Sequence, residues 1–169
     1  MNFILRPWER RDLGSLVKYA NNLNIAKFMT NQFPHPYTIE DGKAFIETAA
    51  TGKPVNIMAI EVNNEAAGGI GIHLQPDIYC MNAEMGYWLA EPFWGKGIIT
   101  KAIIQMKDYA FSNWKLERIY ARPFGTNKAS QRVLEKAGFT REALFLKTIY
   151  KYGENHDEQV FGIRKLSKQ

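Results

Sequence analysis

The longest regular pattern of apolar and polar positions in this chain runs from residue 98 to residue 111. Apolar side chains recur there at three- and four-residue spacing, as on one face of a helix: Ile98, Ile99, Ala102, Ile103, Met106, Ala110 and Phe111. An apolar run over 81–90 precedes this pattern, and Pro92, Gly95 and Gly97 stand between the two. The pattern therefore predicts a strand, a glycine-bearing turn and a long helix in succession.

The same patterns divide the rest of the chain into further strands and helices. Further strands are predicted over residues 2–5, 55–62, 65–74, 118–122, 139–151 and 159–166. Helices are predicted after Asp12 as N-cap through Leu23, over 24–29 as a short turn, from Thr38 through Ala50, and from Asn127 to Gly138. Together they predict one α/β (α+β) domain over 1–169, with a central, mostly antiparallel twisted sheet of about seven strands flanked by helices.

Composition and charge narrow the class of protein. Apolar content of 46% and charged content of 23% are ordinary for a globular chain, and no apolar run is long enough for a membrane span. Cys80 is the only cysteine and no signal peptide is recognisable, so we expect a cytoplasmic protein. The net charge of +5 comes from scattered basic residues, which disfavours nucleic acid as the partner. The three histidines and Cys80 lack metal-ligand spacing, so no metal is expected.

The turn that carries Gly95 and Gly97 has the physical properties of an anion site. The N-terminus of a helix leaves backbone N–H groups without intrahelical partners and carries about half a positive charge. A glycine has no Cβ, so a phosphate can approach such a backbone closely. The segment matches neither the G-x-x-x-x-G-K-[ST] loop nor the G-x-G-x-x-G fingerprint, and a plain turn with a helix cap is the alternative interpretation.

Several motifs in fixed order resemble the GNAT acetyltransferases. One is the segment W-G-K-G from Trp94 to Gly97, and another is N-K-A-S-Q-R-V-L-E-K-A-G-F over 127–139. The block A-E-M-G-Y-W-L over 83–89 is similar to the RimJ/RimL branch of that family. The resemblance implies a GNAT-like sheet, acetyl-CoA as donor and an amine as acceptor.

By this resemblance, two parts of the chain bind the cofactor. Backbone groups at Trp88, Leu89 and Ala90 would contact its pantetheine arm, and Gly95, Lys96, Gly97, Ile98, Ile99 and Thr100 would bind its pyrophosphate. Asn127 would hydrogen-bond the same arm, although an Asn at that position is also a good helix N-cap that needs no ligand.

The resemblance also implies the residues that move protons. Glu84 would act as general base on the amine, directly or through water, and Ser130 as general acid on the departing thiolate. A solvated or ion-paired carboxylate is the alternative for Glu84, and a local bond to its own backbone is the alternative for Ser130. Tyr150 is a second candidate acid, although its apolar strand favours packing.

The resemblance to RimJ/RimL predicts acetylation of a protein N-terminal α-amine. The alternatives are a small-molecule amine, such as an antibiotic, a polyamine or an amino acid, and a non-catalytic CoA-binding sensor. The sequence leaves open whether the chain is a monomer or a homodimer.

Overall fold

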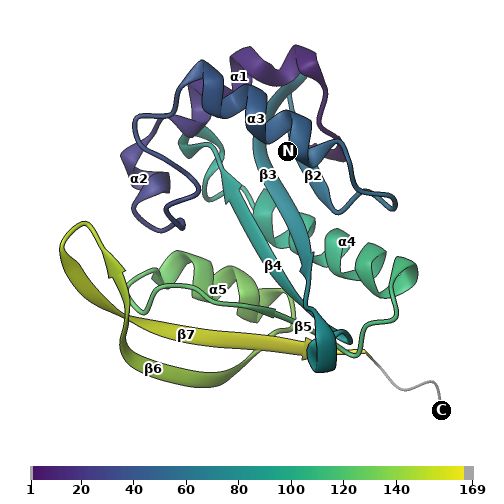
Figure 1. Cartoon of the computed structure of the whole chain (residues 1–169), viewed down its shortest axis with the longest axis vertical. Coiled ribbons are helices and arrows are strands. Elements are labelled where there is room, and N and C mark those ends of the chain that lie inside the picture. The colour runs from purple at the N-terminus through teal and green to yellow at the C-terminus, as the bar shows by residue number, and fades with distance from the viewer. Residues whose placement is uncertain (1, 166–169) are drawn as a thin grey trace. The chain divides into compact units, whose positions relative to one another are not determined.

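The computed structural model describes residues 2–165 and contains a seven-stranded sheet in the order β1-β2-β3-β4-β5-β7-β6 (Figure 1). Neighbouring strands are antiparallel in the pairs β1–β2, β2–β3, β5–β7 and β6–β7, whereas β4 and β5 are parallel. This is the predicted mixed, mostly antiparallel sheet of seven strands flanked by helices. Among the described residues, no helix is both long and apolar enough to cross a lipid bilayer.

The chain divides into two compact units, which are described in turn. The first holds the described residues up to Gly71 together with Tyr87–Ala102, and the second holds Ile72–Gly86 and the described residues from Ile103 onward. Three elements contribute residues to both units: β3 (Glu65–Leu74), β4 (Asn82–Leu89) and α4 (Ile98–Asn113).

The first unit is built from two strands and three helices of its own: β1 (Ile4–Pro7), α1 (Leu13–Ala20), α2 (Leu23–Ala26), α3 (Ile39–Ala49) and β2 (Ile57–Val62). The predicted helix start at Thr38 is confirmed, and α3 begins there with a capping box in which the side chains of Thr38 and Asp41 each accept from the other's backbone N–H. Trp8, Leu16 and Ile46 belong to its buried core.

Glycines permit two close contacts in this unit. A Cβ on Gly42 of α3 would lie 2.7 Å from Leu13 of α1, so the small residue lets these helices pack. A Cβ on Gly68 would lie 2.5 Å from the carbonyl oxygen of Trp88. The missing Cβ of Gly68 therefore lets the backbones of β3 and β4 approach closely, and the β2–β3 pairing has a register shift at Ile60/Glu61.

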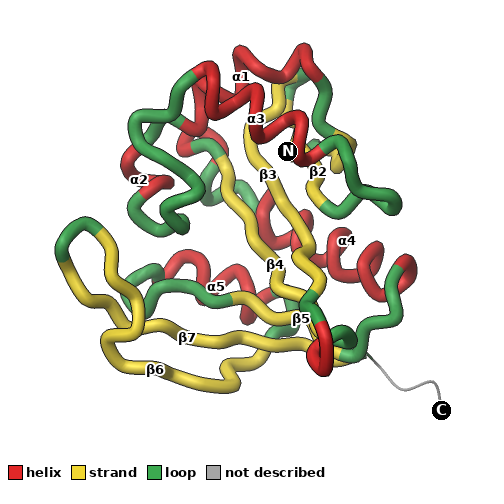
Figure 2. The backbone as a smooth tube through the Cα atoms, in the orientation of Figure 1, coloured by secondary structure: helices red, strands yellow, loops and turns green. Residues whose placement is uncertain are grey.

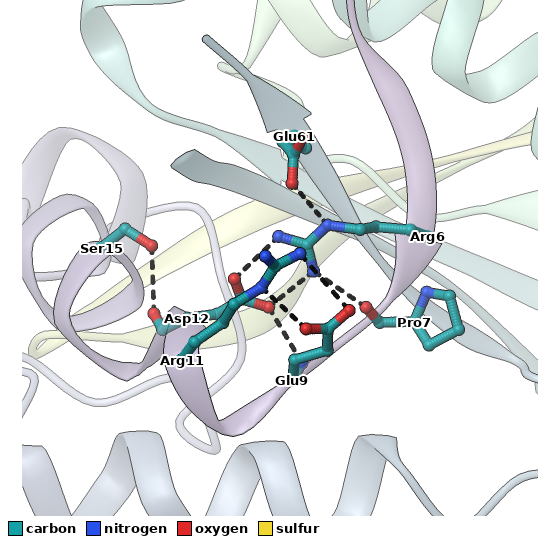
Figure 3. A network of polar contacts seen from close by, with 7 residues as sticks. All are labelled: Arg6, Pro7, Glu9, Arg11, Asp12, Ser15 and Glu61. Atoms are coloured by element: carbon teal, nitrogen blue, oxygen red, sulfur yellow. Dashed lines mark hydrogen bonds and ion pairs between the residues drawn. The ribbon is translucent and has the colours of Figure 1, made fainter. Parts of the chain in front are cut away.

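A network of charged side chains ties β1 to the turn before α1 (Figure 3). Asp12 does stand at the N-cap of α1, but its carboxylate makes no capping bond. It accepts instead from Arg6, through two bonds of 2.7 Å, and from the backbone N–H of Glu9. Arg6 also pairs with Glu61 of β2. The predicted capping role of Asp12 is thus wrong, because the half-buried guanidinium of Arg6 engages its carboxylate instead.

The second unit contains β5 (Arg118–Ala121), α5 (Lys128–Lys136), β6 (Thr140–Lys151) and β7 (Glu154–Arg164). Ile119, Leu134 and Phe161 are fully buried in it. Strand β7 begins five residues earlier than predicted, because Tyr152 and Gly153 form a two-residue turn with positive φ angles and Glu154 pairs at once with Lys151 (Figure 2). The predicted strand end at Leu166 lies outside the described residues.

Candidate functional site

The glycine turn opens α4 as the sequence predicts. Gly95 and Gly97 have φ angles of 73° and 74°, the left-handed region that favours glycine. Both are exposed, and a Cβ built on either would meet nothing within 4 Å. The carbonyl of Gly97 accepts from the N–H of Lys101 at 3.3 Å, so Gly97 is the residue from which the helix starts. An open, Cβ-free backbone therefore leads into a helix N-terminus.

The other residues of this turn differ in what they offer a ligand. The ammonium of Lys96 turns back and donates to the carbonyl of Pro92 at 2.8 Å, over the ring of Phe93. Ile98 is 1% exposed, so its side chain belongs to the core. Ile99 and Thr100 are half-buried in the first turn of the helix. An anion here would therefore meet mainly backbone N–H groups, with Lys96 close by in the chain.

The end of β4 is held by bonds within its own unit. The carbonyl of Leu89 accepts from the indole N–H of Trp94 at 2.7 Å, and the N–H of Ala90 donates to Ala67 at 2.7 Å. Trp88, Leu89 and Ala90 are all buried. A carbonyl has two lone pairs, so the oxygen of Leu89 can accept a further bond from a ligand. Trp94 thereby fixes the strand end against the glycine turn.

In the second unit, Asn127 is the N-cap of α5. Its side-chain oxygen accepts from the backbone N–H of Ser130 at 3.1 Å, which is the local role that the sequence allowed. The capping bond engages the amide oxygen, and the NH₂ group of the same side chain carries two further donor hydrogens. Asn127 and Ser130 are both half-buried.

Gln131 stabilises the loop that presents Asn127. The Gln131 side chain is buried and donates to the carbonyls of Phe124 and Gly125 at 3.1 and 3.0 Å. The N–H of Gly125 donates to Asp157 of β7 at 2.7 Å, and a Cβ on Gly125 would lie 2.9 Å from the Cβ of Asp157. The loop is thus fastened to α5 on one side and to β7 on the other.

Glu84 lies on the opposite face of β4 from its core-facing neighbours Ala83 and Met85. Its carboxylate forms a bidentate ion pair with Arg122, with both N–O distances 3.1 Å. Arg122 also approaches Glu158 of β7 at 3.5 Å. The side chain of Glu84 is 27% exposed. The ion pair that the sequence left as an alternative is present, and the carboxylate remains accessible.

Sequence reasoning missed Tyr120, which lies beside Glu84, and it missed the pairing of Arg122 with Glu84. Tyr120 of β5 is the register partner of Glu84. The pKa of Tyr120 is raised, mainly because the side chain is partly buried and secondly because the charge of Glu84 lies nearby. Hydrogen bonding to Glu84 raises the pKa of Arg122, which stays charged. Tyr120 and Arg122 both line a cavity of about 420 Å³. Strand alternation was the available signal, since Arg118 and Tyr120 share one face of β5 and Arg122, directly after the strand, continues the alternation.

Tyr150 does not pack as its apolar strand suggested. It is 70% exposed, because β6 is the outermost strand of the sheet and offers little cover to its side chains. The packing interpretation is therefore wrong, and Tyr150 stays a candidate acid beside Ser130.

The comparison with protein families identifies the class of this chain. Residues 2–140 match the model of the acetyltransferase (GNAT) domain. The chain therefore belongs to the GNAT family, and the seven-stranded sheet agrees with that assignment.

Individual relatives carry related names. The "Probable N-acetyltransferase YjcK" of Bacillus subtilis is 44% identical over 81 residues, which are 48% of this chain and 45% of that protein. YdaF of the same organism, named as a candidate ribosomal N-acetyltransferase, is 37% identical over 83 residues, 49% of this chain and 45% of YdaF. The chain thus spans about half the length of these relatives.

A solved structure has the same fold over nearly the whole chain. RimL, a ribosomal L7/L12 α-N-protein acetyltransferase solved in complex with coenzyme A, superposes with a TM-score of 0.84. The match covers 97% of this chain and 94% of RimL at 19% sequence identity, so this likeness concerns the fold.

Proposed function

We propose that this chain is a single acetyltransferase domain that transfers the acetyl group of acetyl-CoA to a protein N-terminal α-amine. The observation that carries the proposal is the glycine turn at the start of α4 in a chain of the GNAT family. Coenzyme A contains a pyrophosphate, and the exposed backbone of Gly95 and Gly97 leaves room for such a group at a helix N-terminus.

The residues proposed to hold the cofactor each contribute a different group. The N-terminus of α4, from Gly97 through Thr100, offers backbone N–H groups to the pyrophosphate. The carbonyl of Leu89 and the amide NH₂ of Asn127 offer an acceptor and donors to the pantetheine arm. Acetyl-CoA itself supplies an acetyl group activated as a thioester.

Glu84 is the proposed general base. A free α-amine has a pKa near 8, so deprotonating it at pH 7 costs about 1.4 kcal/mol, against about 4.6 kcal/mol for a lysine side chain. A carboxylate is an adequate base for the first of these. Arg122 has carboxylate partners on two strands, Glu84 and Glu158. It can therefore move toward Glu158 when the ammonium of the acceptor pairs with Glu84.

The transfer is balanced by three proton movements. The ammonium first gives one proton to Glu84, directly or through water, and the neutral amine nitrogen then bonds the carbonyl carbon. As the C–S bond breaks, the hydroxyl of Ser130 gives its proton to the departing thiolate and regains one, through water, from the second N–H of the nitrogen, which leaves an amide and a free thiol. Glu84 returns its proton to solvent. Ser130 stands at the start of α5, where Asn127 fixes its backbone.

The acceptor is inferred from two supports. The block A-E-M-G-Y-W-L of β4 resembles the RimJ/RimL branch, and YdaF, with 37% identity over half of this chain, is named as a candidate ribosomal N-acetyltransferase. A protein N-terminus also presents the more easily deprotonated amine. We expect peptides with a free N-terminus to be acetylated at the α-amine.

Substituting Glu84 tests the mechanism. Glu84→Gln is expected to lower kcat/KM by about 10²–10⁴-fold, the usual contribution of general base catalysis. Glu142→Gln is the matched control, because Glu142 also forms an ion pair with an arginine of β5, here Arg118. Full turnover of Glu84→Gln from pH 6 to pH 9 would exclude Glu84 as the base while leaving the acetyltransferase proposal intact.

A further inference from the structure

A cavity of about 420 Å³ lies beside Glu84 within the second unit. Most of its lining comes from four strands that are neighbours in the sheet, β4, β5, β7 and β6 (Figure 1). Asn82 of β4 lines it and is two positions from Glu84, so both side chains point to the same face of the sheet. Tyr120, the register partner of Glu84, and Arg122, its ion-pair partner, line it as well. The cavity is therefore next to the proposed general base and on the same face.

The charged and amide side chains of the cavity already have partners inside the chain. The charged residues of the lining are ion-paired: Arg118 with Glu142, and Arg122 with Glu84 and Glu158. The NH₂ group of Asn82 donates to the carbonyl of Tyr79 at 3.2 Å, and that of Gln75 donates to a backbone carbonyl at 3.1 Å. A charged occupant would lose its hydration here without gaining an unpaired counter-charge, so the cavity disfavours charged groups.

A glycine of β7 allows the pair between Arg118 and Glu142 to form. Strand β7 lies between β5, which carries Arg118, and β6, which carries Glu142. A Cβ on Gly162 of β7 would overlap the carboxylate of Glu142. The missing side chain therefore lets Glu142 lie across β7 and reach the guanidinium of Arg118. This ion pair is part of the wall of the cavity, and it leaves the remaining lining to decide which group can enter.

The remaining lining is aromatic and aliphatic. It consists of the rings of Tyr79, Tyr120 and Phe145 together with Ala143 and Val160; Tyr79 ends the short helix η2 (Asp77–Tyr79). Tyr79 and Phe145 are 62% and 47% exposed, so their rings are open to an occupant. Pockets for small apolar groups are lined in this way, with few polar groups among rings and aliphatic side chains. An apolar occupant would gain by removing its own surface and these rings from water.

We propose that the cavity receives the side chain of the first residue of the acceptor, and that the enzyme prefers a bulky apolar residue there, such as leucine, methionine or phenylalanine. The preference rests on the proposed function, because that function places the α-amine of the acceptor at Glu84. Neighbouring strands are about 4.8 Å apart, so the ring of Tyr120 lies within reach of such a side chain. Glycine and alanine are too short to fill the cavity.

Peptides that differ only in their first residue test the preference. All carry a free α-amine, and release of thiol from acetyl-CoA measures their kcat/KM. Because burying a large apolar side chain is favourable, the wild type should acetylate a peptide that begins with leucine about 10- to 100-fold more efficiently than the same peptide beginning with glycine. A peptide that begins with glutamate or lysine should not gain this advantage.

Two substitutions test whether the cavity is the source of the preference. Phe145→Ala and Tyr79→Ala should each lower kcat/KM several-fold more for the leucine peptide than for the glycine peptide. Both side chains are largely exposed, so the variants should fold. Leu144→Ala is the matched control, because Leu144 is 48% exposed but lies on the opposite face of β6 from Phe145. It should keep the preference of the wild type.

The possible results separate this preference from the proposed function. Equal kcat/KM for the leucine and glycine peptides, or a full preference in both Phe145→Ala and Tyr79→Ala, would overturn the assignment of the cavity and leave the acetyltransferase proposal intact. An equal loss of preference in Leu144→Ala would place the apolar contact outside the cavity and would also overturn it. Acetylation of small amines without acetylation of any peptide would contradict the proposed acceptor, and the preference with it.

Discussion

Replacing Gly97 should separate the structural role of the glycine turn from its ligand role. The residue has a φ of 74° and starts α4, and a Cβ there would meet no atom within 4 Å. The structural effect of a substitution is therefore backbone strain alone, without a steric clash. A bound pyrophosphate would still meet the added Cβ, because it would approach this same backbone.

The strain has a known size. An alanine held in the left-handed region costs roughly 1–2 kcal/mol, and an asparagine costs less because it adopts this conformation more readily. For a chain of 150–250 residues, about 1 kcal/mol corresponds to a Tm shift of about 2–4 °C. Gly97→Ala should therefore lower Tm by a few degrees, and Gly97→Asn by less. Both variants carry a Cβ, so both should weaken CoA binding by about tenfold or more, or about 1.4 kcal/mol.

Thermal unfolding and CoA titration calorimetry, applied to the same variants, measure the two effects. Gly153→Ala is the matched control, because Gly153 has a φ of 83°, a Cβ added to it would meet nothing within 4 Å, and it has no proposed ligand role. It should lose similar stability and keep its CoA affinity. If Gly97→Ala and Gly97→Asn bind CoA like the wild type, or if Gly153→Ala weakens CoA equally, the reasoning about the glycine turn fails.

Substitutions at three further positions test the contacts that support the fold and the site. Asp12→Asn should cost about 3 kcal/mol in urea unfolding, because it removes one partner of a buried ion pair while Glu61 still holds Arg6. Burial alone would raise the pKa of Asp12, but the hydrogen bonds from Arg6 and the backbone N–H of Glu9 lower it. The stability that this carboxylate contributes is therefore present above about pH 4 and is lost as the pH falls further. The Asp12→Asn variant should lack this contribution at every pH. Asn127→Ala should lower the free energy of unfolding by about 1 kcal/mol and also weaken CoA binding, because it removes both the helix cap and the amide. Asn127→Ser should keep the cap and lose only CoA affinity. Equal CoA affinity in both variants and the wild type would refute the cofactor role. Gln131→Leu should lower the free energy of unfolding by about 1–3 kcal/mol, because the buried side chain loses its two hydrogen bonds to the carbonyls of Phe124 and Gly125. An unchanged urea unfolding midpoint would contradict this.

Local signals predicted the elements whose cause is local. The helix start at Thr38 and the break between the predicted strands 55–62 and 65–74 agree with the structure, because the cap of α3 and the turn at Asn63–Asn64 each depend on residues adjacent in the chain. The start of β7 was placed too late. Its polar residues 154–158 resemble a loop, and only their pairing with β6 makes them a strand.

The site was predictable in parts for the same reason. The glycine turn and the cap at Asn127 are local, and both are present. The pair between Glu84 and Arg122 joins residues 38 positions apart through the parallel register of β4 and β5, which no local pattern contains. The exposure of Tyr150 likewise depends on β6 being outermost, which is a property of the sheet order.

Release of free thiol from acetyl-CoA tests the central claim most directly. The acceptors are a peptide with a free N-terminus, the same peptide with its N-terminus blocked and its lysines intact, and a panel of small amines. We expect thiol release with the free peptide, an acetyl group on its α-amine by mass spectrometry, and only background release with the blocked peptide. Release with small amines alone would contradict the proposed acceptor, and failure to bind CoA in calorimetry would contradict the assignment of residues 95–100 as the cofactor site.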